Sequence, residues 1–394
     1  MRVLRITPLW DWRALDPPPR LARPQDSVGG HAAQALRIAV ATAGAGVEQL
    51  VLAPSVPGAP REAQLAEGAR VRAVGPAGIP GVHRRNLAWL AGLLAALPSQ
   101  RRERWDLVHV HASGIVEPLW GARAALAALR RPLVVTLHHS AQVTYRARSR
   151  RDAAVQLVTR AAERSVVRRA ARTLTLTDRV AGLLGAQGTL ATLPDCVDTE
   201  SFARGPRAAA GGRLVGRLGV PAGAPVALYA GRVSAEKGWR DLIELAAALP
   251  DLHVVIAGDG PEMDELRACA GERLHIAGAL SHEEVAAAMA VADVLVLPSR
   301  FEELGSVLIE AMAAGLPSVA YDVGGVAEAM APDVTGLLVA AGDTAALVGA
   351  VDRAVTDAAL RERTRREGPR IARERYSQAA LGVRLARLYE ELAG

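Results

Sequence analysis

The sequence predicts an α/β protein with two doubly wound parallel sheets, in two domains that face a central cleft. Short apolar or β-branched segments alternate with Ala-, Leu- and Arg-rich segments of helical period, up to residue 203 and again from residue 225. This alternation is typical of parallel sheets with crossover helices. The stretch between them, RGPRAAAGGRLVGRLGVPAGAP, is rich in Gly and Pro, and we interpret it as a linker region.

The strands follow from the apolar segments in order. In the first half they are VLRIT, EQLVLA, VRAV, DLVHVHAS, PLVVTLHH and RTLTLT; in the second half they are PVALYAG, DLHVVIAGDG, RLHIAG, ADVLVLPS, LPSVAYD and TGLLVA. Ser281 and Glu284 match a helix-starting capping box. We place an N-terminal domain at residues 1–205, a C-terminal domain at 206–375, and a helix at 376–394 that has no strand of its own to cover.

Composition narrows the class of protein. Apolar runs end well before the roughly 18 residues of a membrane span, and the N-terminus MRVLRITPLW has no signal-peptide core. We therefore expect a cytoplasmic protein without integral membrane association. Cys196 and Cys269 have no disulfide or zinc spacing. The net charge of +6 suits an anionic partner, but aromatic residues are only 3% and no nucleic-acid motif is present, so a small anionic ligand fits at least as well.

One loop concentrates an unusual choice of residue. Lys237 in GRVSAEKGWR is the chain's only lysine, although Lys and Arg together number 47. Lys237 and Arg232 are predicted at a strand end beside a helix N-terminus, which is a geometry that favours anions. A planar guanidinium and a compact ammonium together suit a diphosphate. The alternative is a turn with two solvated cations.

A second constellation lies in PSRFEELGSVLIEAMAAGLP. Glu302 is predicted in a loop after a strand, and Glu310 on the helix that follows. Backbone amides of Leu304, Gly305 and Ser306 form another helix-start anion site. The hydroxyl groups of a nucleotide sugar would give both carboxylates a partner; the alternative is a capped helix with solvated acids.

Together these segments resemble the family 4 retaining glycosyltransferases of GT-B fold. The family pattern G-R-x-x-x-E-K-G stands at residues 231–238, and the E-x7-E motif runs from Glu302 to Glu310, followed by AMAAG. A G-x-G-P turn at 258–261 and LPDCVDTESF at 193–202 also match, although Asp and Cys replace the usual Asn and Gly in the latter. The resemblance covers nearly the full chain.

The resemblance implies roles for the donor side. Arg232 and Lys237 would hold the diphosphate of a UDP-sugar, Glu310 would bind the ribose hydroxyls, and Glu302 would contact the transferred sugar beside the amides of Leu304 to Ser306. Gly231 and Gly258 belong to the donor loops. The reaction would retain configuration by a front-face mechanism without a protein nucleophile. No D-x-D sequence occurs, so we expect no metal and no other cofactor.

In the N-terminal domain, Gly29 and Gly30 resemble the family's glycine turn beneath the phosphates. His138 matches the histidine that family members place near the reacting sugar, and His139 is the weaker candidate. In the GT-B fold the terminal helix crosses back to this domain, and residues 376–394 are expected to do so.

The acceptor is predicted from the loop after the first strand. Trp10, Asp11, Trp12 and Asp26 offer aromatic faces and carboxylates that suit a small, cationic, polyhydroxylated ligand. The phrases EKGWR, FEELGS and LPDCVD are similar to glycosyltransferases of aminoglycoside-antibiotic biosynthesis, which implies transfer of N-acetylglucosamine or a related hexose from UDP to 2-deoxystreptamine or a pseudodisaccharide.

Two alternatives remain open at this point. Residues 145–172 form a basic segment of helical period, which in a peripheral enzyme with a lipid or polysaccharide acceptor would lie on anionic membrane. A nucleic-acid-binding protein is the other, and it rests on the arginines alone. The sequence leaves the oligomeric state open.

Overall fold

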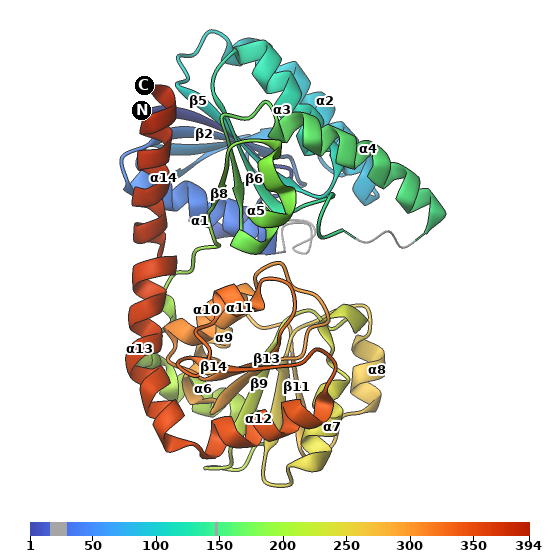
Figure 1. Cartoon of the computed structure of the whole chain (residues 1–394), viewed down its shortest axis with the longest axis vertical. Helices are drawn as coiled ribbons and strands as arrows, with labels where there is room; N and C mark the ends of the chain where they lie inside the picture. Colours follow the sequence, from blue (N-terminus) through green and yellow to red (C-terminus); the bar gives the residue numbers. More distant parts are fainter. Residues whose placement is uncertain (16–29, 146–148) are drawn as a thin grey trace. The chain divides into compact units, whose positions relative to one another are not determined.

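The computed structural model describes residues 1–15, 30–145 and 149–394, and the chain forms two compact units. Unit 1 contains Met1–Cys196 and Gln378–Gly394, and unit 2 contains Val197–Ser377. In each unit helices cover a mostly parallel sheet (Figure 1). The predicted α/β class, with two doubly wound halves, is confirmed.

Unit 1 is built on an eight-stranded sheet of order β3-β4-β2-β1-β5-β6-β7-β8, in which only the β3–β4 pair is antiparallel. The sequence prediction missed β3 and β8. The strands are β1 Arg2–Ile6, β2 Glu48–Pro54, β3 Glu62–Ala66, β4 Ala69–Val74, β5 Leu107–Ser113, β6 Leu133–His139, β7 Arg172–Thr175 and β8 Leu190–Thr192.

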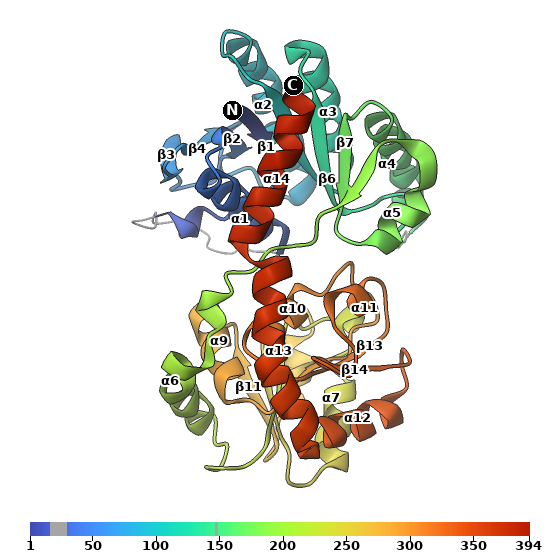
Figure 2. The same cartoon turned by 60° about the vertical axis from the view of Figure 1, so that its left-hand side comes forward.

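The helices of unit 1 cover the two faces of this sheet. They are α1 Gly30–Gly44, α2 Val82–Gln100, α3 Val116–Leu129, α4 Arg150–Val167, α5 Asp178–Leu184 and α14 Gln378–Ala393. One face packs with α2 and α3 around Trp89, Leu93 and Leu119. On the other face α14 lies along α1 (Figure 2), and its Leu381 and Leu385 are fully buried.

Unit 2 is built on a six-stranded parallel sheet of order β11-β10-β9-β12-β13-β14. Its strands are β9 Val226–Ala230, β10 His253–Ala257, β11 Leu274–Gly278, β12 Val294–Leu297, β13 Ser318–Tyr321 and β14 Gly336–Val339. Its helices are α6 Arg204–Arg217, α7 Asp241–Ala248, α8 Met263–Ala268, α9 His282–Val291, α10 Ser306–Ala313, α11 Val326–Ala329, α12 Thr344–Thr356 and α13 Ala358–Tyr376. Ser281 and Glu284 form the predicted capping box of α9.

The predicted linker is wrong in its first part, because residues 204–217 form helix α6. Gly211 on this helix allows close packing, because a Cβ there would lie 2.1 Å from the carbonyl oxygen of Ala287 on α9. The boundary between units lies at Cys196 and Val197, earlier than the predicted one after residue 205. Within unit 2 the Val197 amide donates to the Tyr376 carbonyl at the end of α13.

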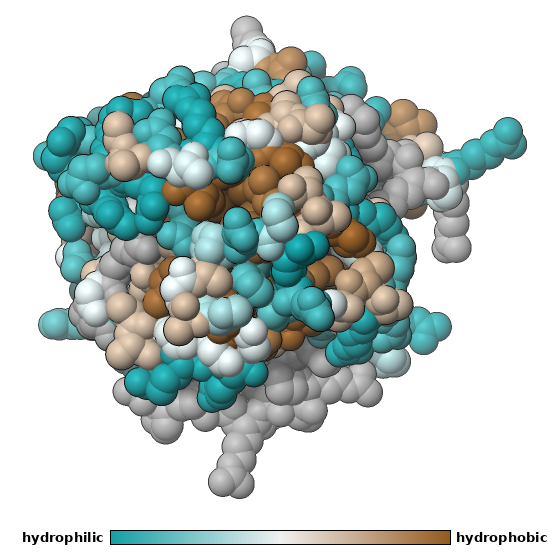
Figure 3. All heavy atoms as spheres, turned by 90° about the horizontal axis from the view of Figure 1, so that it is seen from below, coloured by the Kyte–Doolittle hydropathy of each residue, from teal (hydrophilic) through white to brown (hydrophobic). Residues whose placement is uncertain are grey.

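Polar and charged residues cover much of the surface seen in Figure 3, with smaller apolar groups between them. Within the described residues, no helix is both long enough and apolar enough to cross a membrane.

Candidate active site

Each sheet has a point where the strand order reverses. In unit 1 the chain builds outward from β1 on one side and from β5 on the other, and in unit 2 the same division lies between β9 and β12. Ligands of doubly wound sheets bind outside the carboxyl ends of the strands at this division. The loops after β9 and β12 hold Lys237 and Glu302, so the structure brings both predicted donor segments to this position in unit 2.

The loop after β9 is fixed by its neighbours. The Gly231 amide donates to the Ala257 carbonyl at 3.0 Å, and the Tyr229 hydroxyl donates to the Arg232 carbonyl at 2.8 Å. Burial, and next the charge of Glu302, raise the pKa of Tyr229. Gly258 must be glycine because φ is +159° and a Cβ would lie 1.8 Å from the Gly231 carbonyl oxygen. The two predicted glycine loops therefore lie against each other.

Lys237 and Glu302 form an ion pair across the division. The Lys237 Nζ lies 2.7 Å from Glu302 Oε1, and the two side chains are 24% and 11% exposed. The Ser299 hydroxyl donates to the same carboxylate oxygen at 2.7 Å. Gly238, at φ +67°, brings the β9 loop against β12, since a Cβ there would lie 1.9 Å from the Pro298 carbonyl oxygen. The only lysine of the chain is therefore held at a carboxylate that the sequence assigned to the transferred sugar.

Arg232 is arranged differently from Lys237. Its guanidinium pairs with Glu236 four residues later and its side chain is 56% exposed. It lies on the same loop, and more than half of its side chain is exposed, so an anionic group can reach it.

The second predicted motif surrounds the start of α10. Gly305 caps the helix in the left-handed region, at φ +83°, and Leu304 is buried. Ser306 opens α10 and Glu310 lies one turn later, so their side chains share a helix face. This arrangement presents backbone N–H groups at a helix start within the same loop as Glu302.

In unit 1, His138 is 3% exposed near the end of β6. Its ring stacks on that of His31 with centroids 4.0 Å apart. Gly30 begins α1, and its neighbour His31 in the first turn brings this helix against His138. Gly29 and Asp26 lie outside the described residues.

Behind His138 lies a buried polar cluster that sequence reasoning missed. Arg5 on β1 is fully buried, and its Nη1 contacts His109 Nδ1 at 2.9 Å and His111 Nε2 at 3.0 Å. Its Nη2 donates to Tyr389 on α14 at 3.2 Å. A signal was present: the alternation H-V-H in an apolar strand places both histidines on one face of the sheet.

The histidines of this cluster are held neutral. Burial, with a minor contribution from His139, lowers the pKa of His31 to about 3. Burial also lowers the pKa of His109, His111 and His138 well below the usual value, and the charge of Arg5 acts in the same direction on His109 and His111. Ring nitrogens of His31, His111 and His138 lie within 4.8 Å of one another, the kind of grouping that can ligate a metal ion.

The structure corrects the predicted acceptor residues. Trp10 and Trp12 are 2% and 0% exposed and pack with Val51 and Val71, so their ring faces belong to the core. The Asp11 carboxylate caps the short helix Trp12–Ala14 and pairs with Arg13 at 2.9 Å.

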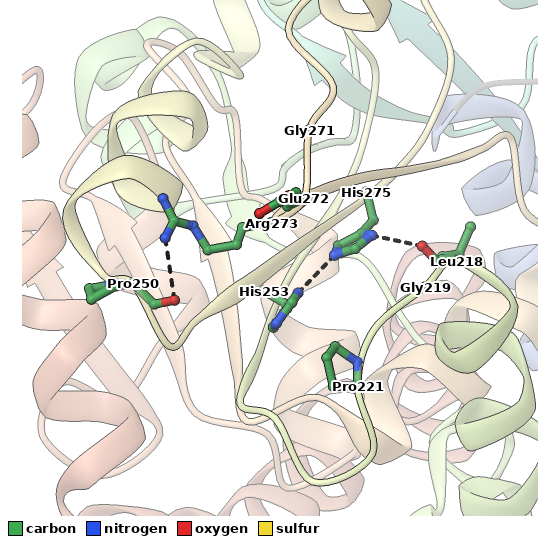
Figure 4. Close-up of a pocket in the computed structure, with 9 residues that line it drawn as sticks. All are labelled: Leu218, Gly219, Pro221, Pro250, His253, Gly271, Glu272, Arg273 and His275. Carbon is green, nitrogen blue, oxygen red and sulfur yellow. Dashed lines mark hydrogen bonds between the residues drawn. The ribbon is translucent and has the colours of Figure 1, made fainter.

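A pocket also opens at the other end of the unit 2 strands, away from the donor loops (Figure 4). It is formed by residues at the amino ends of β10 and β11 and by neighbouring loops: Leu218, Gly219, Pro221, Pro250, His253, Gly271, Glu272, Arg273 and His275. His253 Nδ1 lies 2.9 Å from His275 Nε2. This edge is remote from the carboxyl ends of the strands, so the pocket is separate from the donor loops.

Comparisons with known proteins agree with the geometry. Residues 214–371 match the family model described as glycosyl transferases group 1, and residues 29–192 match a glycosyl transferase 4-like domain. The chain is a group 1 glycosyltransferase. Among solved structures, sucrose-phosphate synthase from Thermosynechococcus elongatus superposes with a TM-score of 0.83 at 22% identity, covering 100% of this chain and 99% of that one, which shows a shared GT-B fold.

Two curated relatives are similar over most of this glycosyltransferase. A 2-deoxystreptamine N-acetyl-D-glucosaminyltransferase from Streptomyces fradiae is 40% identical, covering 92% of this chain and 90% of the relative. A 2-deoxystreptamine glucosyltransferase from Streptomyces kanamyceticus is 36% identical, covering 83% of this chain and 89% of the relative.

Proposed function

We propose that this glycosyltransferase moves N-acetylglucosamine or a related hexose from a UDP-sugar to a hydroxyl of a small aminocyclitol, 2-deoxystreptamine or a pseudodisaccharide, with retention of configuration. The observation that carries the donor assignment is the Lys237–Glu302 pair at 2.7 Å where the unit 2 strand order reverses. The acceptor assignment is supported by the names of the relatives at 40% and 36% identity.

The chemistry rests on charge that develops at the departing diphosphate. Lys237 supplies a compact cation, Arg232 supplies exposed guanidinium donors, and the amides at the start of α10 add fixed dipoles. Glu302 is oriented by Ser299 and Lys237, so its second oxygen is available to a sugar hydroxyl. The departing phosphate oxygen takes the acceptor proton, and no side chain attacks the sugar.

We also propose that transfer needs no metal ion. The histidine group in unit 1 is the one candidate for a metal among the described residues. His111 Nε2, however, faces Arg5 Nη1 at 3.0 Å and His111 Nδ1 faces His138 at 2.9 Å. A metal on His111 Nδ1 would leave a proton on Nε2 pointing at another donor, so Arg5 disfavours ligation.

Product analysis tests the proposal. Purified protein with EDTA is incubated with UDP-N-acetylglucosamine or UDP-glucose and with 2-deoxystreptamine, a pseudodisaccharide, inositol phosphate or a lipid phosphate. Mass spectrometry should detect a hexosyl aminocyclitol, and NMR of its anomeric proton should show retention. Lys237→Ala should lower kcat about 10²- to 10³-fold. Arg267→Ala removes a cation that is 64% exposed on the same unit and should leave the rate unchanged.

Transfer only to another acceptor would remove the aminocyclitol assignment and keep the donor site. Loss of activity in EDTA that Mg²⁺ or Zn²⁺ restores would overturn metal independence. Inversion at the anomeric carbon would overturn the front-face mechanism. Absence of transfer and of UDP release with either donor would remove the donor assignment itself.

One observation favours a second candidate, a transferase that works at a membrane surface. On α4, Val155, Leu157 and Val158 are 47%, 67% and 53% exposed, within a basic helix. Sedimentation with anionic vesicles decides between them: binding that Leu157→Gln abolishes supports a lipid acceptor, and no binding supports the small acceptor.

A further inference from the structure

Two hydrogen bonds connect the interior of unit 1 to His138. Arg5 Nη1 lies 3.0 Å from His111 Nε2, and His111 Nδ1 lies 2.9 Å from His138 Nε2. Arg5 and His111 are 0% exposed and His138 is 3% exposed, so water does not compete for these contacts. The line runs across strands β1, β5 and β6, which are neighbours in the sheet.

The direction of the first bond is fixed by arginine chemistry. A guanidinium has five N–H donors and no acceptor. All five find acceptors around Arg5: Gln49 from Nε, His109 and His111 from Nη1, and Thr42 and Tyr389 from Nη2. His111 Nε2 therefore accepts. A neutral imidazole that accepts at Nε2 carries its proton on Nδ1.

The hydrogen bond between His111 and His138 in turn determines the tautomer of His138. The Nδ1–H of His111 points at His138 Nε2, so His138 accepts there and carries its own proton on Nδ1. We propose that Arg5 and His111 are positioning residues that hold His138 in the Nδ1–H form, so that it offers its ligand a hydrogen-bond donor and not a proton acceptor. The nature of that ligand, an oxygen of the sugar or phosphate, rests on the proposed function; the tautomer does not.

The rest of the cluster supports the guanidinium without reaching His138. His109 accepts from Arg5 at Nδ1 and contacts Thr136 at 2.8 Å from Nε2, which ends that branch. Tyr389 accepts from Arg5 and faces His109, so the terminal helix α14 helps to hold the cation. Thr136 therefore provides a matched control: it is fully buried in the same cluster but lies off the line from Arg5 to His138.

The tautomer is measurable without substrate. The chain has nine histidines. In protein labelled with [¹⁵N]histidine, the ring signals of His138 are identified by their absence from the spectrum of His138→Gln. Long-range ¹H–¹⁵N spectra of the wild-type protein at neutral pH should show Nδ1 protonated and Nε2 unprotonated. His111→Leu removes the donor and should convert His138 wholly or partly to the Nε2–H form. His111→Asn keeps a donor near the Nδ1 position and should preserve the wild-type form, as should Thr136→Val.

Activity provides the second measurement. His111→Leu should lower kcat by up to about 10²-fold, the scale of losing one preorganised donor, and His111→Asn should recover most of it. A wild-type His138 protonated on Nε2, or a spectrum that His111→Leu leaves unchanged, would overturn the proposal. An Nδ1–H signal in a protein without transferase activity would instead refute the proposed function and leave the tautomer assignment standing.

Discussion

Acidification should destabilise unit 1 because its buried histidines exclude protons. His31, His109, His111 and His138 all have pKa values lowered by burial, with Arg5 adding to the effect on two of them. In the unfolded chain these side chains titrate near about 6.5. Between that value and the folded pKa, which is about 3 for His31, only the unfolded state takes up the proton.

The sign and size follow from proton linkage. Stability is fully present above pH of about 6.5 and is lost as the pH falls toward the folded pKa, because the unfolded state binds more protons. For His31 the loss is on the order of 1 kcal/mol at roughly pH 5.5 and grows by a similar amount per further unit of pH. The other three histidines change stability in the same direction, because burial lowers the pKa of each of them as well.

Urea unfolding at several pH values measures this loss. Tryptophan fluorescence reports mainly on unit 1, which contains all tryptophans of the chain except Trp239. The midpoint should fall steeply below about pH 6.5. His31→Gln should make the dependence shallower by about one proton, whereas the exposed His83→Gln should not change it. A midpoint that stays constant down to about pH 5.5 would refute the assignment of neutral, proton-excluding histidines.

Three further predictions concern single positions. Gly324→Ala should destabilise unit 2 by at least about 1–3 kcal/mol, since φ is +58° and a Cβ would lie 1.7 Å from the Glu302 carbonyl oxygen, whereas Gly349→Ala, with open space around it on α12, should stabilise by about 0.5–1 kcal/mol; thermal unfolding compares them. Tyr389→Phe should cost about 1–3 kcal/mol in urea unfolding, because Arg5 loses a buried acceptor. Lys237→Arg keeps the charge but not the compact ammonium at Glu302, so UDP affinity by calorimetry should fall; unchanged affinity would argue against a point-charge role.

Much of the fold was predictable from the sequence because strand signals and helix signals alternate along most of the chain. The donor loops were predictable for the same reason: once β9 and β12 are identified, their carboxyl ends are where Lys237 and Glu302 stand. Composition alone was a poor guide to the structure between the two predicted halves. Residues 204–217 have the glycine content of a linker, yet Gly211 serves close approach of α6 to α9, and sequence gives no measure of helix separation.

The acceptor side was harder because it depends on which way side chains face. Trp10 and Trp12 lie in a segment without regular period, so the sequence could not place them in the core, where both are buried. Arg5 was overlooked because its partners are distant in the sequence. A lone arginine in a strand at the start of the chain gives no hint that strand β5 brings two histidines to it.

A histidine at position 111 is explained by its two contacts, with Arg5 on one side and His138 on the other. A carboxylate at this position would accept a hydrogen bond from Arg5 and neutralise its charge. It would, however, have no N–H group to donate to His138. A serine would be too short to span contacts of 3.0 Å to Arg5 and 2.9 Å to His138 at opposite ends of one ring. A neutral imidazole accepts at one nitrogen and donates at the other in a rigid ring, so it transmits the direction of the Arg5 bond across the sheet. The same reasoning makes His138 a donor, a role that is consistent with the proposed mechanism without a protein base.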